Sequence, residues 1–209
     1  MSTATSKVYI TPEQYEEIEE RSEIRHEYYR GEMFAMSGGT EAHSLITGNL
    51  IRALGNNLED RPCKVYTNDM RVKVNATGLY TYPDVSVVCG PAIFTQSEQK
   101  TTLLNPTVVI EVLSPSTEKY DRSTKLNHYL RVDSIREIVL VAQDEIRIDR
   151  LRRPEGDEKE WLWSSMLNRD DVLTLPSIAC EIPLSRIYAR TDVPDVPDEP
   201  LRPAVVDND

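Results

Sequence analysis

The sequence predicts a single domain of mixed α/β class, and three observations support that prediction. Residues 107–142 show a strand–helix–strand succession, which is typical of a βαβ crossover with parallel strand pairing. Residues 145–175 instead have the short strands and exposed turn of an antiparallel set. The chain has 209 residues, a length that fits one domain with a substantial buried core.

The N-terminal segment predicts a capped helix followed by a hairpin. Thr11 can cap a helix, Pro12 suits the first helical position, and Gln14 completes a capping box. We therefore expect a helix over residues 12–21. Residues 27–36 then form two short runs about a central Arg-Gly pair, a pattern typical of a β-hairpin.

A long helix and a strand-rich middle come next. Residues 41–58 carry apolar side chains at helical spacing, which predicts one buried face: Leu45, Ile46, Leu50, Ile51, Leu54 and Leu58. Four later segments favour strands, namely residues 63–67, 70–74, 83–89 and 107–113. The last of these is nearly all apolar, as expected for a strand that is buried on both faces.

The crossover helix and the C-terminal part complete the predicted domain. We expect a helix over residues 118–131 and an apolar strand over residues 137–142. Residues 183–189 can form a short terminal helix, and three segments before it predict antiparallel strands: residues 145–151, 161–164 and 172–175. Residues 1–190 thus form one predicted domain, and the acidic, proline-rich residues 191–209 predict a flexible tail.

The charge distribution limits the classes of function. The formal net charge is −11, which argues against nonspecific binding of the whole surface to a polyanion. The charge is uneven, because residues 61–73 hold four basic side chains against one acid and residues 114–136 hold five against three. A locally basic face is therefore compatible with a nucleic-acid substrate.

Neither a membrane anchor nor an export signal is visible in the sequence. No stretch approaches the roughly 20 apolar residues that span a bilayer, and the N-terminus lacks an apolar signal core. We therefore expect a cytoplasmic protein. Cys63, Cys89 and Cys180 are far apart and odd in number, which predicts buried reduced thiols and neither metal ligands nor a disulfide framework.

Two carboxylates occur within apolar strand sequence. Asp84 lies near the start of one predicted strand, and Glu111 lies inside another. A carboxylate among Val and Ile is costly unless it is paired, hydrogen-bonded or bound to a cation. Side chains on the same face of adjacent strands lie about 5 Å apart, so this pair predicts a site for Mg²⁺ or Mn²⁺. The alternative is that Asp84 caps its strand while Glu111 pairs with an arginine.

Lys125 is the natural candidate for the positive charge that phosphoryl transfer requires. It lies on the predicted helix that folds back over the strand of Glu111. Leu126 and Tyr129 place it at the edge of the buried face of that helix. The alternative is an exposed ion pair with Asp121, four residues earlier on the same helix.

Several motifs together resemble a known family. They are Tyr82-Pro-Asp-Val-Ser-Val-Val, Pro106-Thr-Val-Val-Ile-Glu-Val-Leu-Ser-Pro-Ser-Thr, Tyr120-Asp-Arg-Ser-Thr-Lys-Leu-Asn-His-Tyr-Leu and Ile135-Arg-Glu-Ile-Val-Leu-Val, with Gly31-Glu32 and His43 upstream. In these motifs the chain resembles the bacterial family of uncharacterised putative restriction endonucleases within the PD-(D/E)XK superfamily. The resemblance covers roughly residues 11–190.

The resemblance implies a restriction-endonuclease-like core, with a central mixed β-sheet flanked by helices. It implies that Asp84 and Glu111 are catalytic metal ligands. Most of the superfamily has a lysine two residues after the second acid, where this chain has Leu113. The resemblance therefore implies that the lysine has moved to the following helix, at Lys125. Lys119 is the next candidate for that role.

Glu32 and His43 are secondary candidates for the site. In the superfamily an early acid often contributes to the metal shell, and Glu32 could take that part. His43 lies in the first turn of the long predicted helix, where the helix N-terminus favours a phosphate. Its alternative is a surface or capping histidine. Tyr129 and Asp69 are candidates for supporting the site indirectly.

The expected function is a Mg²⁺- or Mn²⁺-dependent endonuclease that hydrolyses the phosphodiester bonds of DNA. DNA is the expected substrate, because no aromatic-rich platform for RNA is visible. One alternative is a catalytically inactive nuclease-fold protein that acts in nucleic-acid binding or assembly. Another is a structural domain whose acids form ion pairs. A homodimer is expected, since cutting both strands needs two sites and two-fold assemblies are common.

Overall fold

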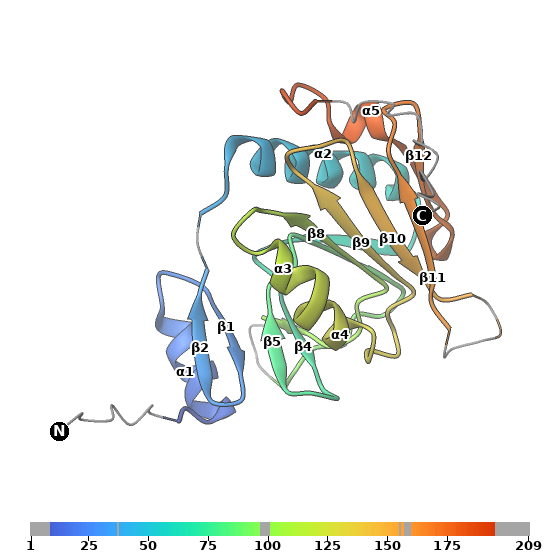
Figure 1. Ribbon diagram of the computed structural model, residues 1–209. Coiled ribbons are helices and arrows are strands. Elements are labelled where there is room, and N and C mark those ends of the chain that lie inside the picture. The colour runs from blue at the N-terminus through green and yellow to red at the C-terminus, as the bar shows by residue number, and fades with distance from the viewer. Residues whose placement is uncertain (1–8, 37, 97–100, 155, 157–159, 195–209) are drawn as a thin grey trace, which may run out of the picture.

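The computed structural model describes residues 9–36, 38–96, 101–154, 156 and 160–194 (Figure 1). Most of the predicted tail, residues 195–209, lies outside the described residues. No helix within the described ranges is long and apolar enough to cross a membrane.

The central element is a six-stranded mixed sheet in the order β11-β10-β9-β8-β6-β3. Its strands are β3 (Cys63–Thr67), β6 (Val85–Cys89), β8 (Val108–Leu113), β9 (Glu137–Ala142), β10 (Ile148–Arg152) and β11 (Leu162–Met166). The pair β8 and β9 is parallel, and the other neighbours are antiparallel. The predicted parallel crossover and the antiparallel pairing of β10 with β11 are both confirmed.

A second, five-stranded sheet contains the N-terminal hairpin, in the order β2-β1-β5-β4-β7. It is built from β1 (His26–Tyr29), β2 (Glu32–Ala35), β4 (Arg71–Val74), β5 (Leu79–Thr81) and β7 (Thr102–Leu103). Helix α1 (Pro12–Arg21) begins with the predicted capping box and packs beside the hairpin (Figure 1). The very short strands β5 and β7 were not predicted.

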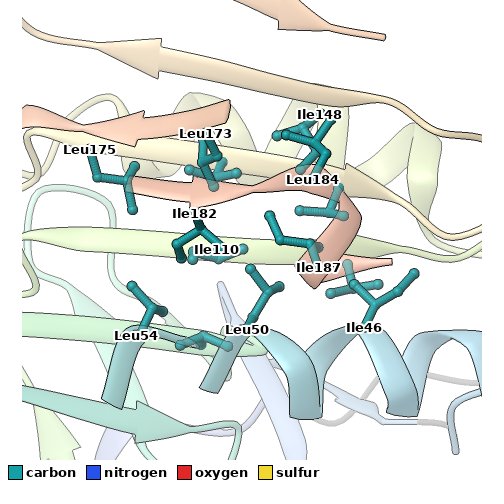
Figure 2. Close-up of a cluster of buried hydrophobic side chains, with 14 of the residues drawn as sticks. Ile46, Leu50, Leu54, Ile110, Ile148, Leu173, Leu175, Ile182, Leu184 and Ile187 are labelled. Carbon is teal, nitrogen blue, oxygen red and sulfur yellow. The ribbon is translucent and has the colours of Figure 1, made fainter. Parts of the chain in front are cut away.

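Helix α2 (Glu41–Leu58) covers one face of the six-stranded sheet, and its bounds match the prediction. Figure 2 shows Ile46, Leu50 and Leu54 of this helix near Ile110 of β8. The C-terminal elements close the same core: β12 (Val172–Leu175), a 3₁₀ turn (Pro176–Ile178), β13 (Cys180–Pro183) and α5 (Leu184–Ile187). Strand β12 pairs with β13 in a separate two-stranded sheet, whereas we had expected it beside β10 and β11.

The opposite face of the sheet is covered by the crossover segment. The predicted helix over residues 118–131 is divided into α3 (Glu118–Tyr120), a π-helical turn η1 (Asp121–Lys125) and α4 (Leu126–Tyr129). Side chains alternate along β8, so Ile110 faces α2 while Val109 and Leu113 pack in the core cluster that contains Leu126 and Tyr129. Glu111 shares this second face, which directs its carboxylate toward the crossover segment.

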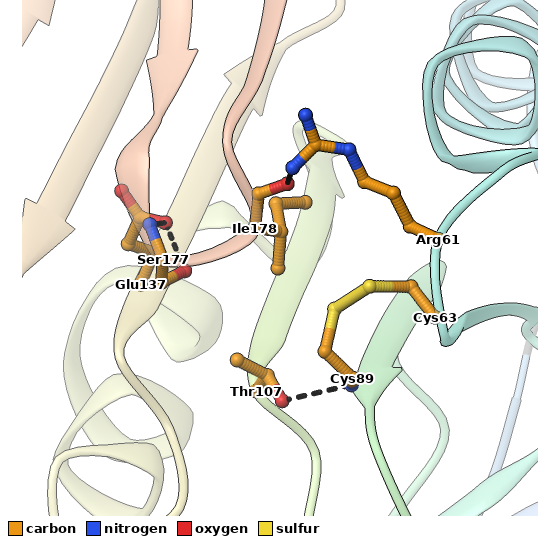
Figure 3. The surroundings of a disulfide bond; sticks show 7 residues. All are labelled: Arg61, Cys63, Cys89, Thr107, Glu137, Ser177 and Ile178. Atoms are coloured by element: carbon orange, nitrogen blue, oxygen red, sulfur yellow. Dashed lines mark hydrogen bonds between the residues drawn. A yellow bond between two sulfur atoms is a disulfide. The ribbon is translucent and has the colours of Figure 1, made fainter.

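The cysteine prediction is wrong for two of the three residues. Cys63 and Cys89 are opposite each other on antiparallel β3 and β6, and they form a disulfide (Figure 3). The Gly90 N–H donates to the Pro62 carbonyl, so the cysteines occupy a non-hydrogen-bonded position, where side chains come closest. Their Cα atoms are 4.0 Å apart. Cys180 is buried as a free thiol, as expected.

Candidate functional site

A cavity of about 760 Å³ contains most of the predicted site residues. It is lined by the hairpin, the start of α2, the segment before β6, the end of β8 and the crossover segment. The structure brings Asp84, Glu111, Lys125 and His43 together in its wall. Glu32, at the start of β2, and Lys119 are not among the lining residues.

Lys125 lies at the centre of a buried group of carboxylates. The residue is 5% exposed, so the alternative of an exposed surface pair with Asp121 is wrong. Its Nζ lies 2.8 Å from Glu111 Oε1, 3.2 Å from Glu27 Oε1 and 3.5 Å from Asp121 Oδ1. Burial alone would lower the pKa of Lys125, but these acids raise it well above its usual value. The ammonium group therefore stays protonated.

The π-helical turn η1 explains how two side chains of one short segment reach the cavity. The N–H of Leu126 donates to the carbonyl of Asp121, five residues earlier, so one extra residue is accommodated in this turn. Asp121 and Lys125 are both buried, and both line the cavity. Single π-helical turns often occur at functional sites.

Glu111 is 3% exposed and is held by two partners. The Tyr129 hydroxyl donates to Glu111 Oε1 at 2.6 Å, and the Lys125 ammonium lies beside the same oxygen. Burial raises the pKa of Glu111 to about 8, although Lys125 opposes that rise, and the nearby charges of Asp121 and Asp84 add to it. The carboxyl group thus readily takes up a proton even beside Lys125, unless a further cation binds to it.

Asp84 lies immediately before β6 and connects β8 with helix α2. Its Oδ2 accepts a hydrogen bond of 2.7 Å from the N–H of Val112 on β8 and lies 3.2 Å from Nε2 of His43. His43 is in the first turn of α2, where Thr40 serves as the N-cap. The hydrogen bond to Asp84 raises the pKa of His43 above its usual value, and burial of the imidazole opposes that rise.

Two acids at the site, Glu27 and Asp121, are not among the site residues predicted from the sequence. Glu27 on β1 contacts Lys125 and accepts a hydrogen bond from the Thr81 hydroxyl, whereas the expected early acid was Glu32. Asp121 was considered only as a surface partner of Lys125. The sequence hardly indicates that Glu27 points toward the site, because β1 has only four residues and so shows little alternation of buried and exposed side chains.

Two carboxylates with free oxygens fit a hard divalent cation. Asp84 Oδ1 and Glu111 Oε2 make no hydrogen bond within the described part of the chain, so each acid retains a donor oxygen. Across the described residues, no group of three or more His, Cys, Asp or Glu side chains is arranged to hold a metal ion. Mg²⁺ bound by only one or two carboxylates keeps several water ligands, so the pair remains chemically suitable.

Comparison with known proteins identifies relatives over most of the chain. Two uncharacterised proteins of Synechocystis sp. are similar to this chain. The first is 36% identical over 183 residues, an alignment that covers 86% of this chain and 91% of the relative. The second is 29% identical over 170 residues, which cover 81% of this chain and 94% of the relative. A crystal structure from Anabaena variabilis, described as a putative nuclease belonging to DUF820, is 20% identical with a TM-score of 0.64, covering 80% of this chain and 91% of that one.

These similarities confirm the predicted class, with mixed sheets flanked by helices in a fold shared with the Anabaena protein. The family model Uma2, described as "Putative restriction endonuclease", matches residues 12–185. That range includes every element from α1 to β13 and all the residues at the cavity. The chain belongs to the Uma2 family of putative restriction endonucleases.

Proposed function

We propose that this protein is a metal-dependent endonuclease that hydrolyses the phosphodiester bonds of DNA. One observation carries the proposal: Asp84, Glu111 and Lys125 come from three separate segments and meet, buried, in the wall of one cavity. The family relationship and the shared fold support it. In this proposal Asp84 and Glu111 hold Mg²⁺ or Mn²⁺, and Lys125 is the lysine that replaces the usual one on the strand.

The packing of Leu113 explains why a lysine is absent from this strand position and supports its proposed replacement by Lys125 on the helix. It packs with Leu126 and Tyr129, which fixes the crossover helix against β8. The same packing places Lys125 beside Glu111, so a cation reaches the acid from the helix instead of from the strand. A lysine at position 113 would put a charge into this apolar contact.

The residues divide the chemistry among them. A bound divalent cation would supply Lewis-acid stabilisation of a phosphate oxygen and an activated water molecule. Lys125 stabilises the negative charge that develops on the phosphate, since its ammonium group is fixed by its acidic neighbours. Tyr129 orients the Glu111 carboxylate through its hydrogen bond. His43, beside Asp84 in the first turn of α2, lines the cavity and donates a hydrogen bond to a phosphate oxygen.

Cleavage of supercoiled plasmid in Mg²⁺ or Mn²⁺, with a chelator control, tests the proposal. Wild-type protein should nick the plasmid, and Glu111→Gln and Lys125→Met should each lose cleavage by about 100-fold or more, as expected for loss of an electrostatic catalytic group. Lys119→Met is the matched control, because Lys119 is an exposed lysine on the same segment outside the cavity. Full activity of Lys125→Met would refute the role of Lys125.

The alternative is a nuclease-fold protein that binds nucleic acid without cutting it. Its supporting observation is that Lys125 already compensates Glu111, which would let the acids persist without a cation. Mn²⁺ binding measured by calorimetry separates the two functions. Mn²⁺ binding that Asp84→Ala and Glu111→Ala abolish supports the metal site, whereas nucleic-acid binding without Mn²⁺ binding or cleavage would favour the alternative. The homodimer and the cytoplasmic location stay predictions.

A further inference from the structure

We infer that the cavity accepts a single-stranded or locally unpaired DNA segment, and that Phe34 is the surface on which an unstacked nucleobase rests. The inference rests on the proposed nuclease function and names the form of DNA that the site acts on. It assigns a substrate-binding role to the hairpin β1–β2, which the proposed chemistry uses only through Glu27.

The first step is the burial of the reacting groups. Asp84, Glu111 and Lys125 are 8%, 3% and 5% exposed, so a phosphodiester must enter the cavity to reach them. A cavity of about 760 Å³ has the size of a typical small-molecule pocket, which suits one or two nucleotides and not a double helix. A base can enter the cavity beside its phosphate only when it is unpaired, because the bases of a duplex stay in the stack.

The second step is the chemical difference between the parts of the cavity wall. Most of the charged side chains in the wall come from β8, the segment before β6 and the crossover segment, and Glu27 of β1 adds another. The end of β2 and the residue after it supply three consecutive apolar residues, Phe34, Ala35 and Met36. Ile51 of α2 adds a further apolar side chain to the lining. A nucleotide has the matching division, with an anionic phosphate and an apolar base face, so one ligand can contact both parts.

The hairpin register puts the ring of Phe34 near the reacting groups. Phe34 lies directly opposite Glu27 in the hairpin register, so both side chains are on the same face of the hairpin. Glu27 Oε1 lies 3.2 Å from Lys125 Nζ, which directs that face toward the carboxylates. Adjacent cross-strand side chains have Cβ atoms about 5 Å apart. A base on Phe34 would therefore lie close to a phosphate at Lys125.

The exposure of Phe34 distinguishes it from the other aromatic side chains of the cavity. It is 50% exposed, whereas Tyr120 is half-buried and Tyr82 is 6% exposed and donates its hydroxyl to Glu19. Single exposed apolar side chains are common on protein surfaces. Phe34 differs because it is part of an apolar run that lines the same cavity as Glu111. Stacking of bases on accessible aromatic rings is a general mode of single-strand binding.

Cleavage of three matched oligonucleotides in Mn²⁺ tests the inference: a single strand, its perfect duplex, and the duplex with a short bulge. Wild-type protein should cut the single strand and the bulge at least about tenfold faster than the duplex. Phe34→Ala should lower single-strand cleavage between about 5-fold and 150-fold, the effect of losing one base–aromatic stack. Phe34→Tyr should retain cleavage. Trp163→Ala, which removes a ring that is 51% exposed on β11 outside the cavity, should match wild type.

A binding experiment separates failure of this inference from failure of the proposed function. A single strand containing 2-aminopurine is titrated with wild-type protein and with Phe34→Ala in Ca²⁺, and base stacking is followed by fluorescence quenching. If the wild-type protein quenches the fluorescence, Phe34→Ala does not, and neither protein cuts DNA, the base-binding site is supported and the nuclease function is rejected. Equal binding by both proteins, or equal cleavage of duplex and single strand, would overturn the inference.

Discussion

Replacing Lys125 by methionine tests the buried site without requiring any substrate. Methionine is nearly as long as lysine and apolar, so the variant removes the charge while largely filling the space. Three carboxylates lie within 3.5 Å of the Lys125 ammonium, and the residue is 5% exposed. Removing one partner of a buried ion pair costs about 3–5 kcal/mol, because the remaining charge is left uncompensated. We expect a loss of that size in the free energy of unfolding at pH 9.

The loss should depend on pH, with a sign that follows from Glu111. Its pKa in the folded protein, about 8, is above its ordinary value, so its contribution to stability is present at low pH and disappears as pH rises through 8. In Lys125→Met the pKa of Glu111 rises further, so this variant keeps losing stability at pH values above 8, where the wild type no longer does. At pH 6 Glu111 holds its proton in both proteins. The deficit of Lys125→Met should therefore be smaller at pH 6 than at pH 9.

Urea denaturation followed by circular dichroism at both pH values gives the measurement. Lys119→Met is the control, and as an exposed substitution it should change the free energy of unfolding by less than about 0.5 kcal/mol. The reasoning would be refuted if Lys125→Met lost less than about 1 kcal/mol at pH 9, or if its deficit were the same at pH 6. A small loss at pH 9 would mean that Lys125 does not compensate buried carboxylates, and an equal deficit at both pH values would mean that it does not compensate Glu111.

Three further predictions concern metal binding, a hydrogen bond and the disulfide. Mn²⁺ affinity measured by calorimetry should rise by up to about tenfold per pH unit toward pH 8 and then level off, because the Glu111 carboxyl must lose its proton to bind a cation; a flat profile would contradict this. Tyr129→Phe should lower the free energy of unfolding by about 1–3 kcal/mol through loss of its hydrogen bond to Glu111, whereas Tyr66→Phe on β3 should have little effect. Replacing Cys63 and Cys89 together by serine should cost about 3–4 kcal/mol, the entropy of closing a loop of 26 residues, and a reductant should destabilise wild type but not this variant.

Local sequence signals were sufficient for the longer elements. Thr11, Pro12 and Gln14 predicted the start of α1, since a capping box depends on side chains within one helical turn. The apolar spacing over residues 41–58 predicted α2 to its bounds because the whole buried face repeats along a single helix. The strand–helix–strand order likewise predicted the parallel pair of β8 and β9.

Signals from distant segments were needed where prediction failed. Cys63 and Cys89 pair because the register of β3 on β6 puts them opposite each other, and that register is not encoded near either cysteine. The very short strands, such as β7 at Thr102–Leu103, have too few residues to show alternation. The π-helical turn at Asp121–Lys125 also lacks a local signature, since its residues suit an ordinary helix.

For the candidate site, the sequence by itself determined which carboxylates are unusual and which helix could bring a lysine to them. Asp84 and Glu111 were recognisable because acids are costly within apolar strands, a property of each local segment. Only the tertiary structure decided that Glu27, and not Glu32, contacts Lys125, and that Phe34 lies on the same face. Those facts depend on how the hairpin packs against the crossover segment, because contacts between segments far apart in the chain exist only after both have folded.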